Sequence, residues 1–314
     1  MDTKTLKADE TGITEAAERL NRGELVAFPT ETVYGLGADA RDDQAVAHIY
    51  EAKGRPNFNP LIVHFASSTD VKHAVLWNEW AEKLAASFWP GALTFILPRS
   101  EDCEISLLVS AGLNTVAVRV PAHEIAHQLI KKAACPIAAP SANTSGKISP
   151  TTAAHVEASL GGRIPCILDG GACAIGLEST VIDLSGDVPT LLRPGGITQD
   201  DIEAELGRVS VGDGEGAVLS PGMLARHYSP NAPISLNVSE FTGTENVLGF
   251  GPSAPAGAVN LSNSCDLVEA AANLFSLLHQ LDQPGANPIA VMPIPETGLG
   301  IAINDRLRRA AARE

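Results

Sequence analysis

The sequence is poor in aromatic residues, in paired cysteines and in positive charge, and each shortage argues against a class of protein. Aromatic residues make up 4% of the 314 residues, so we expect a mostly aliphatic core, as in α/β proteins. The five cysteines are scattered and form no CxxC pair, which argues against a disulfide framework and a zinc ribbon. The net charge of −15 at pH 7 argues against a broad nucleic-acid-binding surface, because such surfaces need clustered Lys and Arg.

Long apolar segments are missing as well. No run of about 18 apolar residues occurs, and the first residues show no apolar segment typical of secretion signals. We therefore expect no membrane span and a cytoplasmic location.

The length and the hydrophobic pattern predict two α/β domains. Hydrophobic residues make up 45% of the chain, enough for a core in each half. Strand-like and helix-like segments mix without strict alternation, which predicts a mixed sheet flanked by helices. We expect a first domain over 1–207, a linker over 208–230 and a small α/β domain over 231–314. The first helix is expected over 14–22, capped by Thr14.

A segment rich in hydroxyls and glycines follows the short apolar strand that ends at Phe28. It runs from Pro29 to Gly37, and Lys53 and Arg55 follow after a helical segment. Hydroxyls and bare backbone suit a small polar ligand. Paired Lys and Arg suit phosphate, because both side chains only donate hydrogen bonds. This region predicts a site for a nucleotide and a second small molecule.

Gly35 and Gly37 also match the dinucleotide-binding pattern GxGxxA. They lie past the strand rather than at its end, and no acidic residue stands about 20 positions further on, where a ribose partner is expected. We interpret them as a glycine turn that allows close approach of the backbone.

Two further segments leave their interpretation open. The segment from His123 to His127 matches the zinc-protease pattern HExxH, but a third ligand is hard to find and Pro121 places His123 at a helix start. The loop from Ser141 to Lys147 fails the phosphate-loop pattern. Its backbone could still bind an anion, or the loop could simply connect two elements.

Arginines and hydroxyls recur at the ends of apolar strands. Arg119 and Arg193 each close an apolar run, and Ser179 opens another. Arg119 could bind a ligand carboxylate or phosphate in a bidentate manner, or form an internal salt bridge. Ligand sites of α/β proteins gather at strand ends, which favours a binding site. The C-terminal arginines, with Arg306 and Arg308 among them, are interpreted as a solvent-exposed helix face.

Eight motifs occur in order along the chain, and together they resemble one family. They begin at Pro29 (PTETVYGL), Lys53 (KGRP), Asn59 (NPLIVH), Trp89 (WPGALT), Arg119 (RVP), Ala139 (APSAN), Ser179 (STV) and Arg193 (RPG). This set resembles the L-threonylcarbamoyladenylate synthase family, which has a YrdC-like domain. The segment SPGMLARHYSP over 220–230 is similar to the linker of its long form, which carries a further C-terminal domain.

The resemblance implies a twisted, YrdC-like mixed sheet and a smaller Rossmann-like α/β C-terminal domain. It implies an enzyme that forms threonylcarbamoyl-AMP and pyrophosphate from L-threonine, bicarbonate and ATP, for threonylcarbamoyladenosine (t6A) modification of tRNA. Mg²⁺ is expected to be carried mainly by the ATP phosphates, and transient contact with a tRNA-modifying threonylcarbamoyl transferase is expected. Such chemistry needs positioning and charge neutralisation more than a protein nucleophile.

The same motifs imply the site residues. Threonine binding is implied for Thr32, His64, Arg119, Ser179 and, through its backbone, Ala139. ATP binding is implied for Arg55, Asn59, Thr115, Ser141, Ser149, Arg193 and Tyr228, of which Tyr228 would close over the nucleotide. Catalytic roles are implied for Lys53, Arg55, Ser141 and Asn143.

Two other functions stay open at this point. A non-catalytic RNA- or tRNA-binding module could use Lys53, Arg55, Arg119, Lys147 and Arg193, although the acidic composition and the many hydroxyls favour a nucleotide pocket. A relative that uses carbamoyl phosphate would carry additional zinc-finger parts, and the absence of CxxC pairs argues against it.

Overall fold

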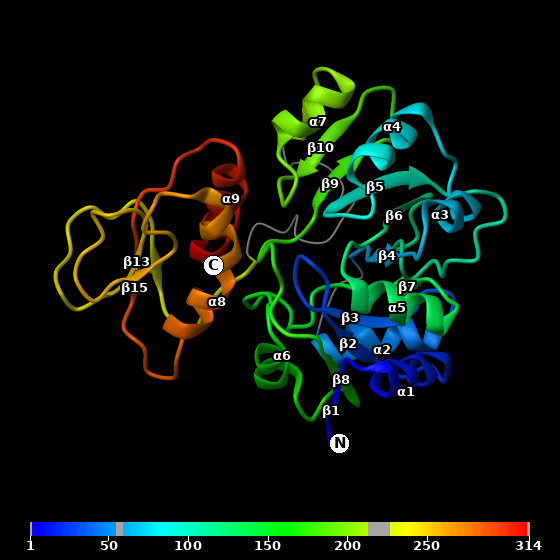
Figure 1. The fold of residues 1–314 in the computed structure, drawn as a ribbon, viewed down its shortest axis with the longest axis horizontal. Helices are drawn as coiled ribbons and strands as arrows, with labels where there is room; N and C mark the ends of the chain where they lie inside the picture. Colours follow the sequence, from blue (N-terminus) through cyan, green and yellow to red (C-terminus); the bar gives the residue numbers. More distant parts are fainter. Residues whose placement is uncertain (1, 55–58, 213–226, 313–314) are drawn as a thin grey trace.

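The computed structural model describes residues 2–54, 59–212 and 227–312. Within these residues the strands form one mixed sheet of eleven strands and one parallel sheet of four. The eleven-stranded sheet and its helices make up a large unit, and the four-stranded sheet and the last two helices make up a small unit (Figure 1). The predicted α/β fold with a mixed sheet is thereby confirmed. No helix in these residues is both long and apolar enough to cross a membrane.

The large sheet brings together segments that are far apart in the sequence. It contains parallel pairs, such as β4 with β6, and antiparallel pairs, such as β5 with β6. In spatial order its strands are β1 (Lys4–Lys7), β8 (Cys166–Asp169), β2 (Val26–Phe28), β3 (Gly35–Asp39), β7 (Ile137–Ala138), β4 (Ile62–His64), β6 (Thr115–Arg119), β5 (Leu93–Pro98), β9 (Thr180–Asp183), β10 (Thr190–Arg193) and β11 (Ser210–Val211).

Helices cover this sheet, and local capping groups determine where they begin and end. Asp42 accepts hydrogen bonds from the N–H groups of Gln44 and Ala45 at the start of α2, and Gly54 ends α2 in the left-handed conformation with φ of 59°. The helices of the large unit are α1 (Glu10–Asn21), α2 (Asp43–Lys53), α3 (Ser68–Ala74), α4 (Glu79–Phe88), α5 (Glu124–Ala133), α6 (Ala153–Leu160) and α7 (Gln199–Leu206).

The predicted start of the first helix is wrong. Helix α1 begins at Glu10, because the Asp9 side chain caps it by accepting a hydrogen bond from the Gly12 N–H at 2.9 Å. Thr14 lies inside the helix, where its hydroxyl donates to the Glu10 carbonyl. Asp9, and not Thr14, is therefore the residue that caps this helix.

The predicted glycine turn is also wrong. Gly35 and Gly37 lie in β3, which pairs antiparallel with β2. A Cβ atom on Gly37 would lie 2.8 Å from side-chain atoms of both Ile137 and Phe28, so a larger residue would clash. The glycines let neighbouring side chains cross the face of the strand, which is a packing requirement that the local pattern did not reveal.

The small unit is a parallel sheet whose two helices lie on the side facing the large unit (Figure 1). Its strand order is β12 (Ile234–Ser235), β15 (Ile289–Val291), β13 (Asn246–Gly249) and β14 (Val259–Asn260), and its helices are α8 (Leu267–Leu281) and α9 (Leu299–Ala311). Part of the predicted linker belongs to the large sheet, because β11 pairs with β10. Residues 213–226 lie outside the described residues, and the predicted domain limits stay a prediction.

Candidate active site

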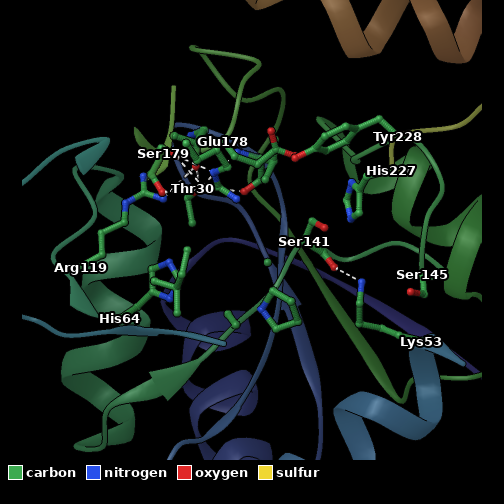
Figure 2. A pocket seen from close by; sticks show the side chains of 17 residues that line it. Thr30, Lys53, His64, Arg119, Ser141, Ser145, Glu178, Ser179, His227 and Tyr228 are labelled. Atoms are coloured by element: carbon green, nitrogen blue, oxygen red, sulfur yellow. Dashed lines mark hydrogen bonds between the residues drawn. The ribbon is translucent and has the colours of Figure 1, made fainter. Parts of the chain in front are cut away.

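A narrow cavity of about 50 Å³ lies where strands β4, β6 and β10 end (Figure 2). The residues that line it come from the segment after β2, from these strand ends, from the loop after β7 and from the stretch before the small unit. The structure thus brings together nine of the predicted site residues: Thr32, Lys53, His64, Arg119, Ala139, Ser141, Ser179, Arg193 and Tyr228. We call this cavity the pocket.

Arg119 defines one end of the pocket. It ends β6, is 3% exposed, and donates from Nη2 to Glu31 Oε1 at 2.6 Å and from Nη1 to Thr32 Oγ1 at 3.0 Å. The internal salt bridge that the sequence left open is therefore present. Burial raises the pKa of the Glu31 carboxyl, but the Arg119 charge and hydrogen bond outweigh it and hold that pKa below its usual range. The guanidinium is fixed in place before any ligand arrives.

His64 lies beside this guanidinium as a neutral imidazole. It ends β4 and pairs with Arg119 in the sheet register, so both side chains start from neighbouring backbone positions. Burial, followed by the positive charge of Arg119, lowers the pKa of His64 to about 3. Its Nδ1 atom is buried and has no hydrogen-bond partner among the described residues. A buried, unsatisfied nitrogen of this kind is suited to a ligand.

Lys53 defines the opposite end of the pocket, and Figure 2 shows it across the cavity from Arg119 and His64. It is the last residue of α2, and its Nζ donates to the Ser141 carbonyl at 2.6 Å and to the Asn143 carbonyl. The Ser145 N–H donates back to the Lys53 carbonyl at 3.0 Å. These bonds hold the loop that follows β7 against the end of α2, with the Ser141 and Ser145 side chains at the cavity.

The wall between the two ends carries a buried carboxylate. Glu178 Oε1 accepts a hydrogen bond from Ser149 Oγ at 2.6 Å, and Oε2 accepts one from Arg306 Nε at 2.8 Å. Burial acts to raise the pKa of Glu178, but the positive charges of Arg306 and Arg193 together have the larger effect and lower that pKa to about 2. Arg193 donates from Nη2 to the Ser179 carbonyl at 2.8 Å. The carboxylate is ionised and compensated by charges on both sides.

Tyr228 closes the pocket from the small unit's side. Its ring stacks on Phe275 of α8 with ring centroids 5.5 Å apart, and it is 1% exposed. Burial raises the pKa of Tyr228 to about 12, so the hydroxyl is a neutral donor. That hydroxyl has no hydrogen-bond partner among the described residues. The backbone adopts a φ of 62°, a strained value for a residue with a side chain, which is typical of functional sites.

Four predicted site residues that the structure describes do not line the pocket. Asn59 is buried near Tyr50, and Thr115 begins β6, at the opposite end of that strand from Arg119. Asn143 and Ser149 are next to lining residues, because the Asn143 carbonyl accepts a hydrogen bond from Lys53 and the Ser149 hydroxyl donates one to Glu178. Arg55 lies outside the described residues.

Several lining residues were missed: Thr30, Val33, Gly35, Ile62, Pro140, Ser145, Glu178 and His227. Most of them stand beside or inside the motifs, so proximity to the chosen residues was the available signal. Thr30 is an example of a neighbour that supports a predicted residue. Its hydroxyl donates to the Val33 carbonyl at 2.7 Å and so shapes the segment that carries Thr32.

The prediction that Arg306 belongs to a solvent-exposed face is wrong. Arg306 is 0% exposed, because Glu178 and the Pro194 carbonyl accept hydrogen bonds from it at 2.8 and 2.9 Å. Arg308 is exposed as expected and pairs with Glu296 at 2.6 Å. The spacing along α9 did not reveal which arginine meets a carboxylate of the large unit.

The alternative interpretations find no support in the described residues. His123 precedes α5 rather than lying on it, and these residues contain no group of three or more side chains placed to hold a metal ion. Lys53, Arg119 and Arg193 are each 3% exposed, so they form the inside of a pocket and not a basic surface for RNA.

The fold and the pocket define a two-unit α/β protein with a narrow, cation-lined ligand site. A family model described as "Telomere recombination" matches residues 18–195, and one described as "Threonylcarbamoyl-AMP synthase, C-terminal domain" matches residues 197–312. The threonylcarbamoyl-AMP synthase of Pyrococcus abyssi is 44% identical over 326 residues, which cover 97% of this chain and 95% of that protein.

Two further comparisons agree. The threonylcarbamoyl-AMP synthase of Bacillus subtilis is 44% identical over 331 residues, covering 98% of this chain and 95% of that protein. The crystal structure of P. abyssi Sua5 complexed with L-threonine matches with a TM-score of 0.91 and 42% identity over 98% of both chains. The chain belongs to the threonylcarbamoyl-AMP synthase family, in the long form with the additional C-terminal domain.

Proposed function

We propose that this chain forms threonylcarbamoyl-AMP and pyrophosphate from L-threonine, bicarbonate and ATP in the pocket. The observation that carries the proposal is the charge pattern: Arg119 lies at one end and Lys53 at the other, with hydroxyls and the neutral His64 along the walls. A ligand carboxylate fits the first end and phosphates fit the second. Family membership supports the same reaction.

L-Threonine is assigned to the Arg119 end. The guanidinium would bind the threonine carboxylate, and the Thr32 and Ser179 hydroxyls would meet its polar groups. His64 would contact the amino acid without adding a charge, because its pKa is about 3. The L-threonine complex of the Pyrococcus relative supports a threonine site in this family.

ATP is assigned to the Lys53 end. Lys53, Ser141 and Arg193 would hold the phosphates, and the Tyr228 hydroxyl, which has no partner among the described residues, would donate to the nucleotide. The ATP-binding roles of Arg55, Asn59, Thr115 and Ser149, and the catalytic role of Asn143, stay predictions.

The reaction would proceed in two steps. The threonine amine first condenses with bicarbonate: the new N–C bond gives a carbamate, and one bicarbonate oxygen leaves as water with the proton that the amine loses. A carbamate oxygen then bonds to the α-phosphorus of ATP, and the bond from that phosphorus to the pyrophosphate oxygen breaks. Positioning and charge neutralisation supply the catalysis, so the absence of a protein nucleophile–base pair among the lining residues is compatible with it.

Mg²⁺ fits a site in which the nucleotide supplies most of the ligands. The described residues hold no cage of metal-ligating side chains, but the Asn143 Oδ1 atom is buried without a partner in the part of the chain that is described. Asn143 and the Ser141 hydroxyl are oxygen donors of the kind Mg²⁺ prefers alongside phosphates. When bound, the ion would offset negative charge on the leaving pyrophosphate.

The pocket must open to admit its substrates. Its volume of about 50 Å³ is far below the roughly 300–1,000 Å³ typical of ligand sites. Tyr228 is the residue that would move, and the neighbouring Ser229 N–H closes the same segment onto the Gly146 carbonyl at 2.8 Å. Closure would exclude water from the unstable carbamate.

The product would be passed to a tRNA-modifying threonylcarbamoyl transferase through transient contact. Threonylcarbamoyl-AMP is a mixed anhydride that water destroys, so direct transfer limits its loss. A cytoplasmic location, where ATP and tRNA occur together, belongs to the same proposal.

Chromatography of the reaction tests the function directly. The purified chain is incubated with ATP, L-threonine, bicarbonate and Mg²⁺. The nucleotides are then separated, and their masses are measured by mass spectrometry. We expect a threonylcarbamoyl-AMP peak that disappears when any one of the three substrates is left out. Salt-sensitive RNA binding without any such product would contradict the proposal.

A further inference from the structure

A buried arginine from the small unit reaches the wall of the pocket. Arg306 lies on α9, is 0% exposed, and donates from Nε to Glu178 Oε2 at 2.8 Å and from Nη2 to the Pro194 carbonyl at 2.9 Å. Its guanidinium carbon also lies 5.3 Å from the centre of the Tyr228 ring. One side chain of the small unit therefore contacts a carboxylate and a ring that both line the pocket.

The carboxylate it meets would otherwise oppose the proposed ligand. Among the described lining residues Glu178 is the one acid. The other charged side chains that line the pocket are the cations Lys53, Arg119 and Arg193. An ionised carboxylate in a buried wall repels a polyphosphate strongly, because the low dielectric screens it little. This pocket can accept a triphosphate at that wall only when the carboxylate is compensated.

Without Arg306, Arg193 would compensate Glu178, but the charge of Arg193 would then contribute less to binding the ligand. Arg193 lies in the large unit and its charge acts on Glu178, so without Arg306 the two would neutralise each other. With Arg306 present, Glu178 faces two guanidinium groups. Arg306 also pairs with Asp305 at 2.6 Å, and Asp305 in turn pairs with Arg309 at 3.0 Å. These three arginines outnumber the two carboxylates by one, and the surplus positive charge comes from the small unit.

We propose that Arg306 is a positioning residue for the ATP end of the pocket: it neutralises and orients Glu178, so that the pocket binds the triphosphate only when the small unit is docked. This inference rests on the proposed function, because it takes the anionic ligand to be ATP. Arg306 does not line the pocket and acts through Glu178. It would therefore affect ATP and leave threonine binding at the Arg119 end nearly unchanged.

Calorimetric titration of the full chain with a non-hydrolysable ATP analogue, and separately with L-threonine, tests this role. For Arg306→Met we expect the Kd for the analogue to rise about tenfold, which corresponds to a loss of about 1.4 kcal/mol of binding free energy. The Kd for threonine should change less than about twofold. Arg306→Lys, which keeps the charge, should restore most of the affinity for the analogue.

Arg308→Met is the matched control, because Arg308 lies on the same helix but is exposed and pairs only with Glu296 among the described residues. This variant should bind both ligands as the unmodified chain does. A loss of affinity in Arg308→Met equal to that in Arg306→Met would mean that helix charge in general matters, and would overturn the proposal.

A cycle with Glu178→Gln separates the mechanism from a folding defect. Arg306→Met alone leaves Glu178 compensated by Arg193 only, whereas Glu178→Gln/Arg306→Met removes the carboxylate together with its second guanidinium. If Arg306 acts through Glu178, the double variant should bind the analogue about as well as Glu178→Gln alone. A further large loss in the double variant, or equal losses for threonine and the analogue in Arg306→Met, would overturn the proposal.

The proposed function and this inference fail in different ways. If the unmodified chain binds the analogue but makes no threonylcarbamoyl-AMP, the proposed function fails, while the affinities still test Arg306. If the unmodified chain does not bind the analogue at all, the inference about Arg306 is overturned as well.

Discussion

The Arg119 end of the pocket and the wall between its two ends each depend on a buried arginine–glutamate pair, but the two pairs are built differently. Arg119 and Glu31 both belong to the large unit, and their side chains meet at 2.6 Å. Glu178 belongs to the large unit and Arg306 to the small one, and they meet at 2.8 Å. The first pair needs one folded unit, whereas the second needs two that are docked.

The position of the arginine differs as well. Arg119 lines the pocket and can meet a ligand directly, while Arg306 does not line it and meets two lining residues, Glu178 and Tyr228. The comparison teaches that a binding end can be formed in advance by one unit, or completed by its neighbour. The following predictions, from the largest expected effect to the smallest, test that difference.

Removing the charge at the threonine end should have the largest effect. Arg119→Met leaves Glu31 as an uncompensated buried carboxylate, so the free energy of unfolding should fall by about 3–5 kcal/mol. Denaturant unfolding measures this, and calorimetry should show threonine binding lost while the ATP analogue still binds. Arg41→Met is the control, because its pair with Asp39 is partly exposed and should contribute at most about 1 kcal/mol. Equal losses for threonine and the analogue in Arg119→Met would show that the two ends are not separate.

Lys53→Met should weaken the ATP end without help from the small unit. The substitution leaves the Ser141 and Asn143 carbonyls without their charged donor, which should cost about 2–3 kcal/mol of unfolding free energy. Steady-state kinetics should show KM for ATP rising about tenfold and KM for threonine changing little. The exposed Lys83 of α4 provides the control, and Lys83→Met should behave as the unmodified chain. A larger change for threonine than for ATP would contradict the assignment.

Acid should destabilise the junction between the units as well as the Arg119 end, where the pKa of His64 is lowered to about 3. His155 of α6 and His279 of α8 stack across the junction with ring centroids 4.0 Å apart. Burial, followed by the neighbouring His279, lowers the pKa of His155 to about 4, and burial lowers the pKa of His279. Between the unfolded value of about 6.5 and these lowered values the unfolded chain binds more protons, so stability falls as pH falls through that window.

Thermal unfolding at several pH values between 7.5 and 4 measures this. His279→Gln keeps an amide that can donate to the Ser149 carbonyl, which His279 Nε2 contacts at 3.1 Å, but removes the titrating group. Its Tm should therefore depend less on pH than that of the unmodified chain. An unchanged pH dependence would show that His279 contributes nothing to acid sensitivity.

Tyr228→Phe should have the smallest effect on stability. Its hydroxyl is buried and has no partner among the described residues, so the free energy of unfolding should change by less than about 1 kcal/mol. Binding of the ATP analogue should nevertheless weaken severalfold if that hydroxyl donates to the nucleotide. Unchanged affinity would show that only the ring of Tyr228 matters.

Much of this structure could be predicted from local sequence features. The large sheet is mixed, as the order of the elements predicts, and the second domain has the predicted α/β content. The ordered motifs named the family and nine of the residues that line the pocket. Caps, periodicity and motifs are local, so one chain segment carries the whole signal.

The sequence by itself determined the fold class, the family and the chemical character of the pocket, because these follow from residue types and their spacing. Only the tertiary structure decided that Gly37 lies in a strand under Phe28, and that Arg306 is buried while Arg308 is exposed. Both outcomes depend on which atoms of distant segments come into contact. Arg306 donates a hydrogen bond to Glu178 of the large unit, and no sequence pattern within α9 indicates that partner.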